Sequence, residues 1–268
     1  MAIATRSVTS RSNPLLVRLR KLVAEPAGYR KLGILLLEGE HLCAAWLARQ
    51  RGPILHALVD EAAMAQRSLQ PLLAAAAEVV VVSAEAMASV SGLESASQIA
   101  FVVGSPAAVS VLAGVATLVL DRIQDPGNAG ALLRSAAAFG FGQVVAMAGT
   151  AALWSPKVVR AGMGAHFSLH LVEGANAAAL DGLALPLLGT SSHAPMRIDA
   201  EPLPWPCAWL LGHEGQGLSP ALAERCTRTL RIPQPGGEES LNVAAAGAVC
   251  LYESARQRGA LDHDKGHA

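Results

Sequence analysis

The sequence has few charged residues and no net charge. Of its 268 residues, 16 % are charged and 52 % are hydrophobic, and the formal net charge is zero. This composition excludes wholesale disorder, because the chain can bury a sizeable core, and it excludes an overall basic field that would announce a nucleic-acid partner. The charges are unevenly placed, however, since residues 1–31 hold seven Lys and Arg against one Glu, a local net charge of +6. Such a segment is compatible with phosphate contacts to RNA, and a solvated basic helix is the simpler alternative.

Closely spaced cysteines and uninterrupted apolar runs are also lacking. The four cysteines are Cys43, Cys207, Cys226 and Cys250. None forms a C-x-x-C pair, so we expect buried thiols in a reducing compartment and not a disulfide or zinc framework. The N-terminus has no apolar run typical of a signal peptide, and glycine and proline interrupt the longest uncharged run, residues 95–120. The sequence therefore predicts a cytoplasmic protein that does not cross a membrane.

Strand patterns alternate with helix patterns along the whole chain. In the first half, helices are predicted over 13–24, 41–51 and 62–78, and strands over 33–39, 55–60, 78–83 and 99–103. In the second half, strands are predicted over 116–121, 143–147, 167–172, 186–191, 208–212 and 229–233, and helices over 128–139, 155–163, 220–225 and after an N-cap at Ser240 or Asn242. Such alternation is typical of an α/β fold. We expect two domains, 1–108 and 109–260, followed by a polar tail over 261–268.

Three polar clusters each follow a predicted parallel strand of the second half. They read D-R-I-Q-D-P-G-N-A-G-A-L-L-R from Asp121, L-L-G-H-E-G-Q-G from Leu210 and E-E-S-L-N from Glu238. Open α/β sheets bind ligands at the carboxyl ends of their strands, so the clusters predict a site for a small polar ligand. Taken singly, each also fits a surface loop with a capped helix. Neither glycine-rich stretch fits G-x-G-x-x-G with a following helix and a downstream acid, so no dinucleotide-binding fold is predicted.

Together the three clusters resemble the motifs of the SpoU (TrmH) family of RNA ribose 2′-O-methyltransferases, within the SPOUT superfamily. The motif N-x-G-x-x-x-R is matched by Asn128, Gly130 and Arg134, G-x-E-G-x-G by Gly212, Glu214, Gly215 and Gly217, and S-L-N-V by residues 240–243. One motif alone is a weak signal, whereas three in the family's order are highly specific, and no polar motif position departs from the pattern. The resemblance covers residues 115–258. Residues 12–103 look more loosely similar to the L30e-like substrate-binding domain that precedes the catalytic domain in many members.

The resemblance implies a fold and a cofactor. The C-terminal domain would contain a deep trefoil knot, which is rare in proteins and is not suggested by periodicity, and would bind S-adenosylmethionine there. The residues implied to line the cofactor site are Thr190, Leu211, Gly212, Ile232 and Leu241. The main chain of the bent loop 232–241 would read the adenine edge, Ile232 and Leu241 would supply apolar walls, and Gly212 would leave room for close approach.

The resemblance also implies catalytic residues. They are Arg134, Asn128, Glu214, Ser240 and Asn242. The difficult step is activation of a ribose hydroxyl, and we expect Arg134 to act as an electrostatic clamp on the developing alkoxide, with proton acceptance left open. Asn128 would position Arg134 or the ribose, and Glu214 could pair with a cationic side chain from the knot or from the partner subunit. Ser240 and Asn242 would orient the loop and the ribose.

The function implied is S-adenosylmethionine-dependent 2′-O-methylation of RNA in a homodimer formed through the C-terminal domain. Ribosomal RNA is favoured as the substrate because an N-terminal domain is present. Transfer RNA is an alternative substrate, and a non-catalytic RNA-binding or assembly protein is an alternative class that the intact Asn128 and Arg134 disfavour. No metal is expected, because His166 and His170 lie four residues apart in a strand pattern with no cysteine or carboxylate nearby.

Overall fold

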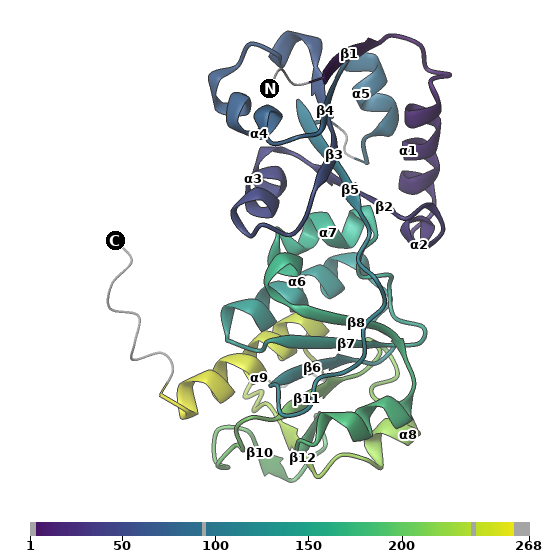
Figure 1. Cartoon of the computed structure of the whole chain (residues 1–268). Coiled ribbons are helices and arrows are strands. Elements are labelled where there is room, and N and C mark those ends of the chain that lie inside the picture. Colours follow the sequence, from purple (N-terminus) through teal and green to yellow (C-terminus); the bar gives the residue numbers. More distant parts are fainter. Residues whose placement is uncertain (1–3, 93–94, 237–239, 260–268) are drawn as a thin grey trace. The chain divides into compact units, whose positions relative to one another are not determined.

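The computed structural model describes residues 4–92, 95–236 and 240–259, which form two compact units (Figure 1). Unit 1 contains the described residues up to Ala107 together with Trp154–Phe167, and unit 2 contains Ala108–Leu153 and the described residues from Ser168 onward. The helix predicted over 155–163 thus belongs to unit 1, although it lies beyond the predicted domain boundary at residue 108. The division into a substrate-binding and a methyltransferase domain stays a prediction.

Unit 1 is built on a five-stranded mixed sheet in the order β1-β4-β3-β5-β2. Its strands are β1 (Ala4–Val8), β2 (Ile34–Glu38), β3 (Ile54–Asp60), β4 (Glu78–Val82) and β5 (Ile99–Gly104). β1 and β3 run parallel to β4, whereas β5 is antiparallel to both of its neighbours. Its helices are α1 (Pro14–Ala24), α2 (Gly28–Leu32), α3 (Glu40–Ala48), α4 (Gln70–Ala74), α5 (Ala84–Val90) and α7 (Pro156–Gly162). α1 and α5 lie together on one side of the sheet, and α3 and α4 on the other (Figure 1).

The helix predicted over 62–78 is wrong. Glu61–Ala63 and Arg67–Leu69 form short 3-10 turns, and only α4 is α-helical in this stretch. Pro71 lies in the first turn of α4, where a missing N–H is tolerated, but a proline there prevents a longer helix from continuing through it. β1 is absent from the predictions because four of its five residues are exposed, so it lacks the apolar pattern of a buried strand.

Unit 2 contains a seven-stranded sheet in the order β10-β12-β9-β11-β6-β7-β8. Its strands are β6 (Thr117–Leu120), β7 (Gln143–Met147), β8 (His170–Ala175), β9 (Leu187–Thr190), β10 (Met196–Arg197), β11 (Ala208–Leu211) and β12 (Arg228–Arg231). Every pair of neighbouring strands is parallel, which confirms the predicted parallel α/β fold. Its α-helices are α6 (Pro126–Ala138), α8 (Pro220–Ala223) and α9 (Val243–Gln257). The implied trefoil knot stays a prediction.

Close packing of α9 against α6 and the sheet depends on a glycine (Figure 1). A Cβ at Gly247 would lie 2.3 Å from Cδ2 of Leu132 and 2.7 Å from Cδ1 of Leu211, so a larger residue would push the helices apart. Asn242 caps α9, since its Oδ1 accepts hydrogen bonds from the amides of Ala244 and Ala245 at 2.9 and 3.2 Å. Asn242 is thus the N-cap, and not Ser240, of the two candidates that the sequence offers.

Two segments of unit 2 differ from prediction. The strand predicted over 167–172 begins three residues late: Ala165–Ser168 is a 3-10 turn, and β8 starts at His170, whose amide donates to the Gly142 carbonyl at 2.9 Å. Between β8 and β11 the structure adds a 3-10 segment, Ala177–Leu183, and the short strand β10. The tail predicted over 261–268 lies outside the described residues.

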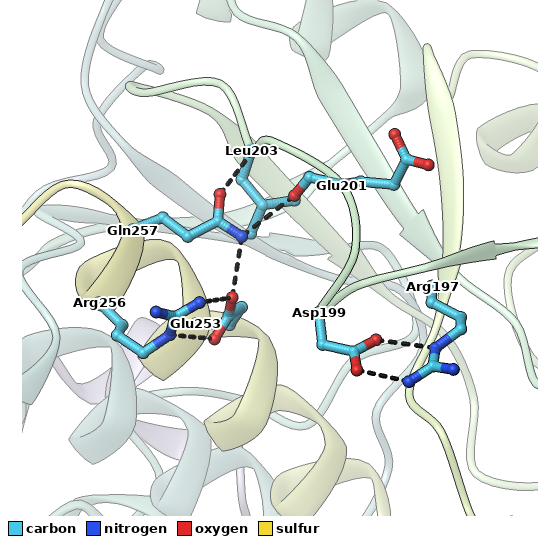
Figure 2. Close-up of polar contacts among 7 residues, drawn as sticks. All are labelled: Arg197, Asp199, Glu201, Leu203, Glu253, Arg256 and Gln257. Atoms are coloured by element: carbon cyan, nitrogen blue, oxygen red, sulfur yellow. Dashed lines mark hydrogen bonds and ion pairs between the residues drawn. The ribbon is translucent and has the colours of Figure 1, made fainter.

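The carboxyl end of α9 is tied to the segment before β11 by a polar network (Figure 2). Glu253 is only 8 % exposed and accepts two hydrogen bonds from the Arg256 guanidinium at 2.7 and 2.8 Å. Gln257 donates to Glu253 and to the Glu201 carbonyl, and accepts from the amide of Leu203 at 2.8 Å. These bonds hold the pKa of Glu253 below its ordinary value, with the Arg256 hydrogen bonds as the largest cause. The network fixes the end of the helix.

The described residues hold neither a reactive thiol nor a metal site. All four cysteines are free, and burial raises the pKa of Cys43 and of Cys207 to about 12, so neither is a thiolate at neutral pH. No group of three or more His, Cys, Asp or Glu side chains in these ranges could hold a metal ion. In the same ranges, each helix is too short or too polar to span a bilayer.

Candidate active site

The carboxyl ends of three parallel strands open onto one cavity of about 550 Å³ in unit 2. β9 and β11 end at it, and the chain enters it again just after β12. The five residues predicted to bind the cofactor all line it: Thr190, Leu211, Gly212, Ile232 and Leu241. Glu214 and Ser240 line it too. A cavity of this size suits a small-molecule ligand. Residues of the second and third polar clusters line it, whereas the first cluster, from Asp121 to Arg134, contributes no lining residue.

Gly212 is required by the loop that it begins. A Cβ at this position would lie 2.1 Å from the carbonyl carbon of Gly217 and 2.2 Å from the amide nitrogen of Leu218. The amides of His213 and Gly217 each donate to the carbonyl of the other, at 3.0 and 2.8 Å, and close the loop into a tight turn. The close approach expected at Gly212 is therefore made by the chain itself, and any larger residue would displace backbone.

Two side-chain hydrogen bonds connect the three sequence motifs. Asn242 Nδ2 donates to Asn128 Oδ1 at 3.0 Å, and Asn128 Nδ2 donates to Glu214 Oε1 at 3.1 Å. Asn128 is itself held by the N-cap of α6, because its amide donates to Asp125 Oδ1 at 2.7 Å. The two helix starts and the loop after β11 are thus fixed relative to one another at the edge of the cavity.

The Glu214 carboxylate is stabilised in its charged form. Partial burial alone would raise its pKa, but hydrogen bonding from its own backbone, from the Asn128 side chain and from the backbone of Asp125 and Gln124 outweighs burial, so the pKa lies below its ordinary value. Its partners are therefore amides. Among the described residues of this chain Glu214 pairs with no cation, so the carboxylate is a fixed negative charge beside the cavity. A cationic partner from the partner subunit stays a prediction.

Arg134 lies apart from the other predicted catalytic residues. It is exposed on α6 and does not line the cavity. Within the described ranges its guanidinium makes no hydrogen bond or ion pair, so Asn128 does not hold it. Ser240 likewise makes no side-chain hydrogen bond there, although it lines the cavity. The structure thus brings Asn128, Glu214 and Asn242 together and leaves Arg134 unengaged.

Asp121 and Arg122, which the sequence analysis does not single out, clamp the loop after β11. Buried Asp121 accepts from the amide of Ser219 at 2.6 Å and from Arg122 Nε at 3.2 Å. Arg122 also donates to the Gln216 side chain at 3.0 Å and to the Gly217 carbonyl at 3.3 Å. Its φ of +58° is rare for a residue other than glycine. The only signal in the sequence is their place at the end of a strand.

Two further polar residues line the cavity without belonging to the motif positions. His213 Nδ1 accepts from the amide of Gly215 at 3.0 Å, which orients its ring in the tight turn. Gln234 follows β12, and its side-chain oxygen is buried without a hydrogen-bond partner in the described part of the chain. Such an acceptor is uncommon in a folded protein, and no pattern in the sequence reveals it.

Solved structures share this fold over nearly the whole chain. An RNA 2′-O ribose methyltransferase superposes with a TM-score of 0.80 at 30 % identity, covering 94 % of this chain and 99 % of that one. The SpoU methyltransferase AviRb from Streptomyces viridochromogenes, in complex with AdoMet, gives a TM-score of 0.83 at 26 % identity over 92 % and 98 % of the two chains. The parallel sheet, the cavity at its edge and the hydrogen bonds between the motifs, together with these matches, place the chain in the class of α/β RNA methyltransferases.

Sequence comparison narrows this class to a family. Residues 116–252 match the family model described as the SpoU rRNA Methylase family. A tRNA/rRNA methyltransferase of Synechocystis, itself described as uncharacterized, is 34 % identical over 94 % of both chains. The 23S rRNA (guanosine(2553)-2′-O)-methyltransferase of Bacillus subtilis is 31 % identical over 83 % of this chain and 88 % of its own. The chain belongs to the SpoU rRNA methylase family, as the three motifs predict.

Proposed function

We propose that the protein transfers a methyl group from S-adenosylmethionine to a ribose 2′-oxygen of ribosomal RNA. The observation that carries the proposal is the pair of hydrogen bonds joining Asn242, Asn128 and Glu214 at the edge of the 550 Å³ cavity. Two of the family motifs thus line one ligand-sized space, and the hydrogen bonds of Asn128 tie the third motif to them. The B. subtilis relative is named as a 2′-O-methyltransferase of 23S rRNA, which supports the substrate class.

The residues around the cavity suit an adenosyl ligand. Ile232 and Leu241 offer apolar surface, and the turn begun by Gly212 supplies backbone groups. Bound S-adenosylmethionine supplies a methyl group that its positively charged sulfur already activates. The anionic Glu214 adds a favourable charge beside a cationic ligand. These residues bind and orient, and none of them needs to react with the cofactor.

The chain's catalytic task is to make a ribose hydroxyl nucleophilic. A guanidinium keeps its proton firmly, so Arg134 acts chiefly by stabilising the developing alkoxide and holding a phosphate. Asn128 and Asn242, fixed by each other, hold the loops that receive the ribose. Preorganised groups of this kind lower the barrier because they need no reorientation during the reaction.

A homodimer would bring Arg134 to a cavity. On α9, Val249 and Tyr252 lie three residues apart and form a short exposed apolar stripe, with 39 and 45 % of the two residues accessible. We propose that two copies pair through this stripe and that Arg134 of one copy serves the cavity of the other. Mixing Arg134→Ala with Asn128→Ala subunits should then restore part of the activity, because each mixed dimer holds one intact site. No restoration would argue against shared sites.

Unit 1 supplies basic surface for the RNA backbone. Arg6 and Arg11 pair with Glu78 and Glu85, so the free positive charge is smaller than the sequence suggests. Lys21 and other cations of α1 and α2 stay exposed, and phosphate contacts of this kind position RNA without reading its bases. Unit 1 therefore binds the RNA substrate, and the shape of the RNA determines which nucleotide is methylated.

Transfer RNA is the second candidate substrate, since the Synechocystis relative is named for both RNA classes. Labelled S-adenosylmethionine should be offered to separate ribosomal and transfer RNA pools that lack endogenous methylation, and the products digested to nucleosides. Label on a 2′-oxygen in ribosomal RNA is expected. Label confined to transfer RNA would replace the substrate and keep the chemistry. Label in neither pool would leave a binding protein as the better description.

A further inference from the structure

The loop after β11 places two polar side chains at the variable positions of its motif. In G-x-E-G-x-G, these positions are His213 and Gln216. Both residues line the cavity, and they form the two ends of one turn, because the amide of Gln216 donates to the His213 carbonyl at 3.3 Å. The ends of such a turn lie within about 7 Å of each other, measured between their Cα atoms. His213 is half-buried and Gln216 is exposed, so the pair lies at the rim of the cavity.

Each of the two side chains is oriented by one hydrogen bond. His213 Nδ1 accepts from the amide of Gly215 at 3.0 Å, so the neutral ring carries its proton on Nε2, which is a donor. Gln216 Oε1 accepts from Arg122 at 3.0 Å, which leaves the two N–H groups of this amide to bind elsewhere. In the described part of the chain, neither side-chain donor has a hydrogen-bond partner. The rim therefore presents two neighbouring donors whose acceptor atoms are already engaged.

The charges on this loop favour a neutral ligand group over a phosphate. Glu214, which lies between the two donors in the motif, is an anionic carboxylate. The charge of Arg122 is offset by Asp121, whose Oδ1 lies 3.2 Å from the Arg122 Nε. One positive charge thus faces two negative ones, and an RNA phosphate would be repelled. Neutral acceptors, such as the oxygen and nitrogen atoms of a base, carry no such penalty.

Two adjacent donors match the edge of one RNA base. Guanine presents two acceptors, O6 and N7, side by side and without a donor between them. On the same edge adenine places an amino donor beside N7, cytosine presents an amino donor, and uracil presents O4 without an adjacent nitrogen acceptor. Bases in single-stranded RNA are open to recognition on this edge. The donors at the rim therefore favour guanine over the other three bases.

We propose that His213 and Gln216 donate to O6 and N7 of a guanine and so select guanosine as the nucleotide whose ribose is methylated. This inference rests on the proposed function, because it assumes that an RNA ribose is methylated at this cavity. RNA shape determines which nucleotide reaches the cavity, and the two side chains discriminate among bases there. Arg122 is a positioning residue, since it orients the Gln216 amide.

The test removes one acceptor from the RNA and both donors from the protein. Unmethylated ribosomal RNA is transcribed with guanosine or with 7-deazaguanosine, in which carbon replaces N7 and base pairing is kept. The kcat/KM of the wild-type protein should be about tenfold lower on the second transcript, the effect of one lost hydrogen bond. A transcript with 7-deazaadenosine is the RNA control and should react at the ordinary rate.

The matched protein is the double variant His213→Phe/Gln216→Met, which keeps side-chain bulk and removes both donors. It should be slower than wild type on ordinary RNA, should treat the two transcripts alike and should still bind S-adenosylhomocysteine. Gln98→Met, at an exposed glutamine of unit 1, is the control variant and should discriminate as wild type does. A double variant that no longer binds S-adenosylhomocysteine would overturn the inference, because the two side chains would then shape the cavity itself.

The remaining outcomes separate this inference from the proposed function. Digestion of the product should yield 2′-O-methylguanosine. Another 2′-O-methylated nucleoside, a wild-type rate that is the same on both transcripts, or a double variant that still discriminates would overturn the role of the two donors and leave the proposed function standing. If wild type forms no 2′-O-methylated nucleoside in any RNA, both are overturned. The wild-type comparison needs no variant, so it holds even if the double variant folds poorly.

Discussion

The two ends of α9 carry polar networks of similar composition and different consequence. At the amino end, Asn242 reaches Asn128 and Glu214 at the rim of a cavity. At the carboxyl end, Glu253 and Gln257 reach Arg256 and the chain around Leu203 (Figure 2), and none of these residues lines the cavity at which the amino end lies. A carboxylate that accepts hydrogen bonds from amides or guanidinium groups therefore does not by itself indicate a ligand-binding site. The adjoining cavity, lined by residues of the family motifs, distinguishes the end that we propose to be catalytic from the other end.

The largest effect is expected at Arg134, which belongs to neither network. Arg134→Ala should lower methyl transfer by at least about 100-fold, since it removes the charge proposed to stabilise the alkoxide. Cofactor affinity and the free energy of unfolding should stay unchanged, because the exposed guanidinium has no partner among the described residues. Arg197→Ala, which breaks only the exposed pair with Asp199, is the control. A variant at Arg134 with wild-type turnover would refute its assigned role.

Asn128→Ala should break the amino-end network. It removes both side-chain bonds that join the motifs, so methyl transfer should fall about 10- to 100-fold through misplaced loops. The free energy of unfolding should fall by only about 1 kcal/mol, the net worth of such bonds at a partly solvated site. Single-turnover rates and urea unfolding measure the two quantities. If Asn128→Ala lost much stability and kept the wild-type rate, the amino end of α9 would have a structural role, like the carboxyl end.

Glu253→Gln should weaken the carboxyl-end network and leave the rate intact. The folded-state pKa of Glu253 lies below its ordinary value of 4.5, so the charged carboxylate stabilises the fold at neutral pH, and this contribution is lost as the pH falls through the folded-state pKa. The variant should be about 1 kcal/mol less stable at pH 7, a small figure because Arg256 is half exposed. The gap to wild type should close in acid. A gap that stays the same as the pH is lowered would mean that the charge is not responsible.

The smallest effect on ligand binding is expected from Arg122→Lys. This substitution tests whether the Arg122 contacts belong to the site at the amino end of α9. Lysine keeps the charge but cannot reproduce the fork that binds Asp121, Gln216 and Gly217 together. The loop after β11 should become looser, and the dissociation constant of S-adenosylhomocysteine should rise about threefold. Calorimetry would detect this change. Unaltered affinity would show that Asp121 and the tight turn suffice.

The sequence predicts the strands that build the site better than the contacts that complete it. β6 and β11 are short apolar runs, T-L-V-L and A-W-L-L, and the polar clusters that follow them fall at one sheet edge for that reason. Asn242 is recognisable as a cap from its place before an apolar stripe. These local patterns suffice for the fold class, and the family resemblance adds five of the residues that line the cavity.

Contacts between distant residues could not be predicted. The Arg122 fork spans 94 and 95 positions in the sequence, and no local pattern encodes it. The unsatisfied oxygen of Gln234 is visible only once neighbouring side chains are placed. The separation of Arg134 from Asn128 is likewise a matter of helix geometry: six residues of α6 turn the two side chains to different directions. In the stretch 62–78, Pro71 is a sequence signal against one long helix. The alanine-rich composition of that stretch favours a helix and outweighed this signal in the prediction.

Methyl transfer to unmethylated ribosomal RNA would separate the two ends of α9. The rates of Asn128→Ala and Glu253→Gln are each compared with wild type at equal folded fraction, and the methylated position on the ribose is identified. Wild type and Glu253→Gln should form a 2′-O-methylated nucleoside at similar rates. The rate of Asn128→Ala should be lower by at least about tenfold. Equal rates from the two variants, or loss of transfer in Glu253→Gln alone, would contradict the assignment of catalysis to the amino end of α9.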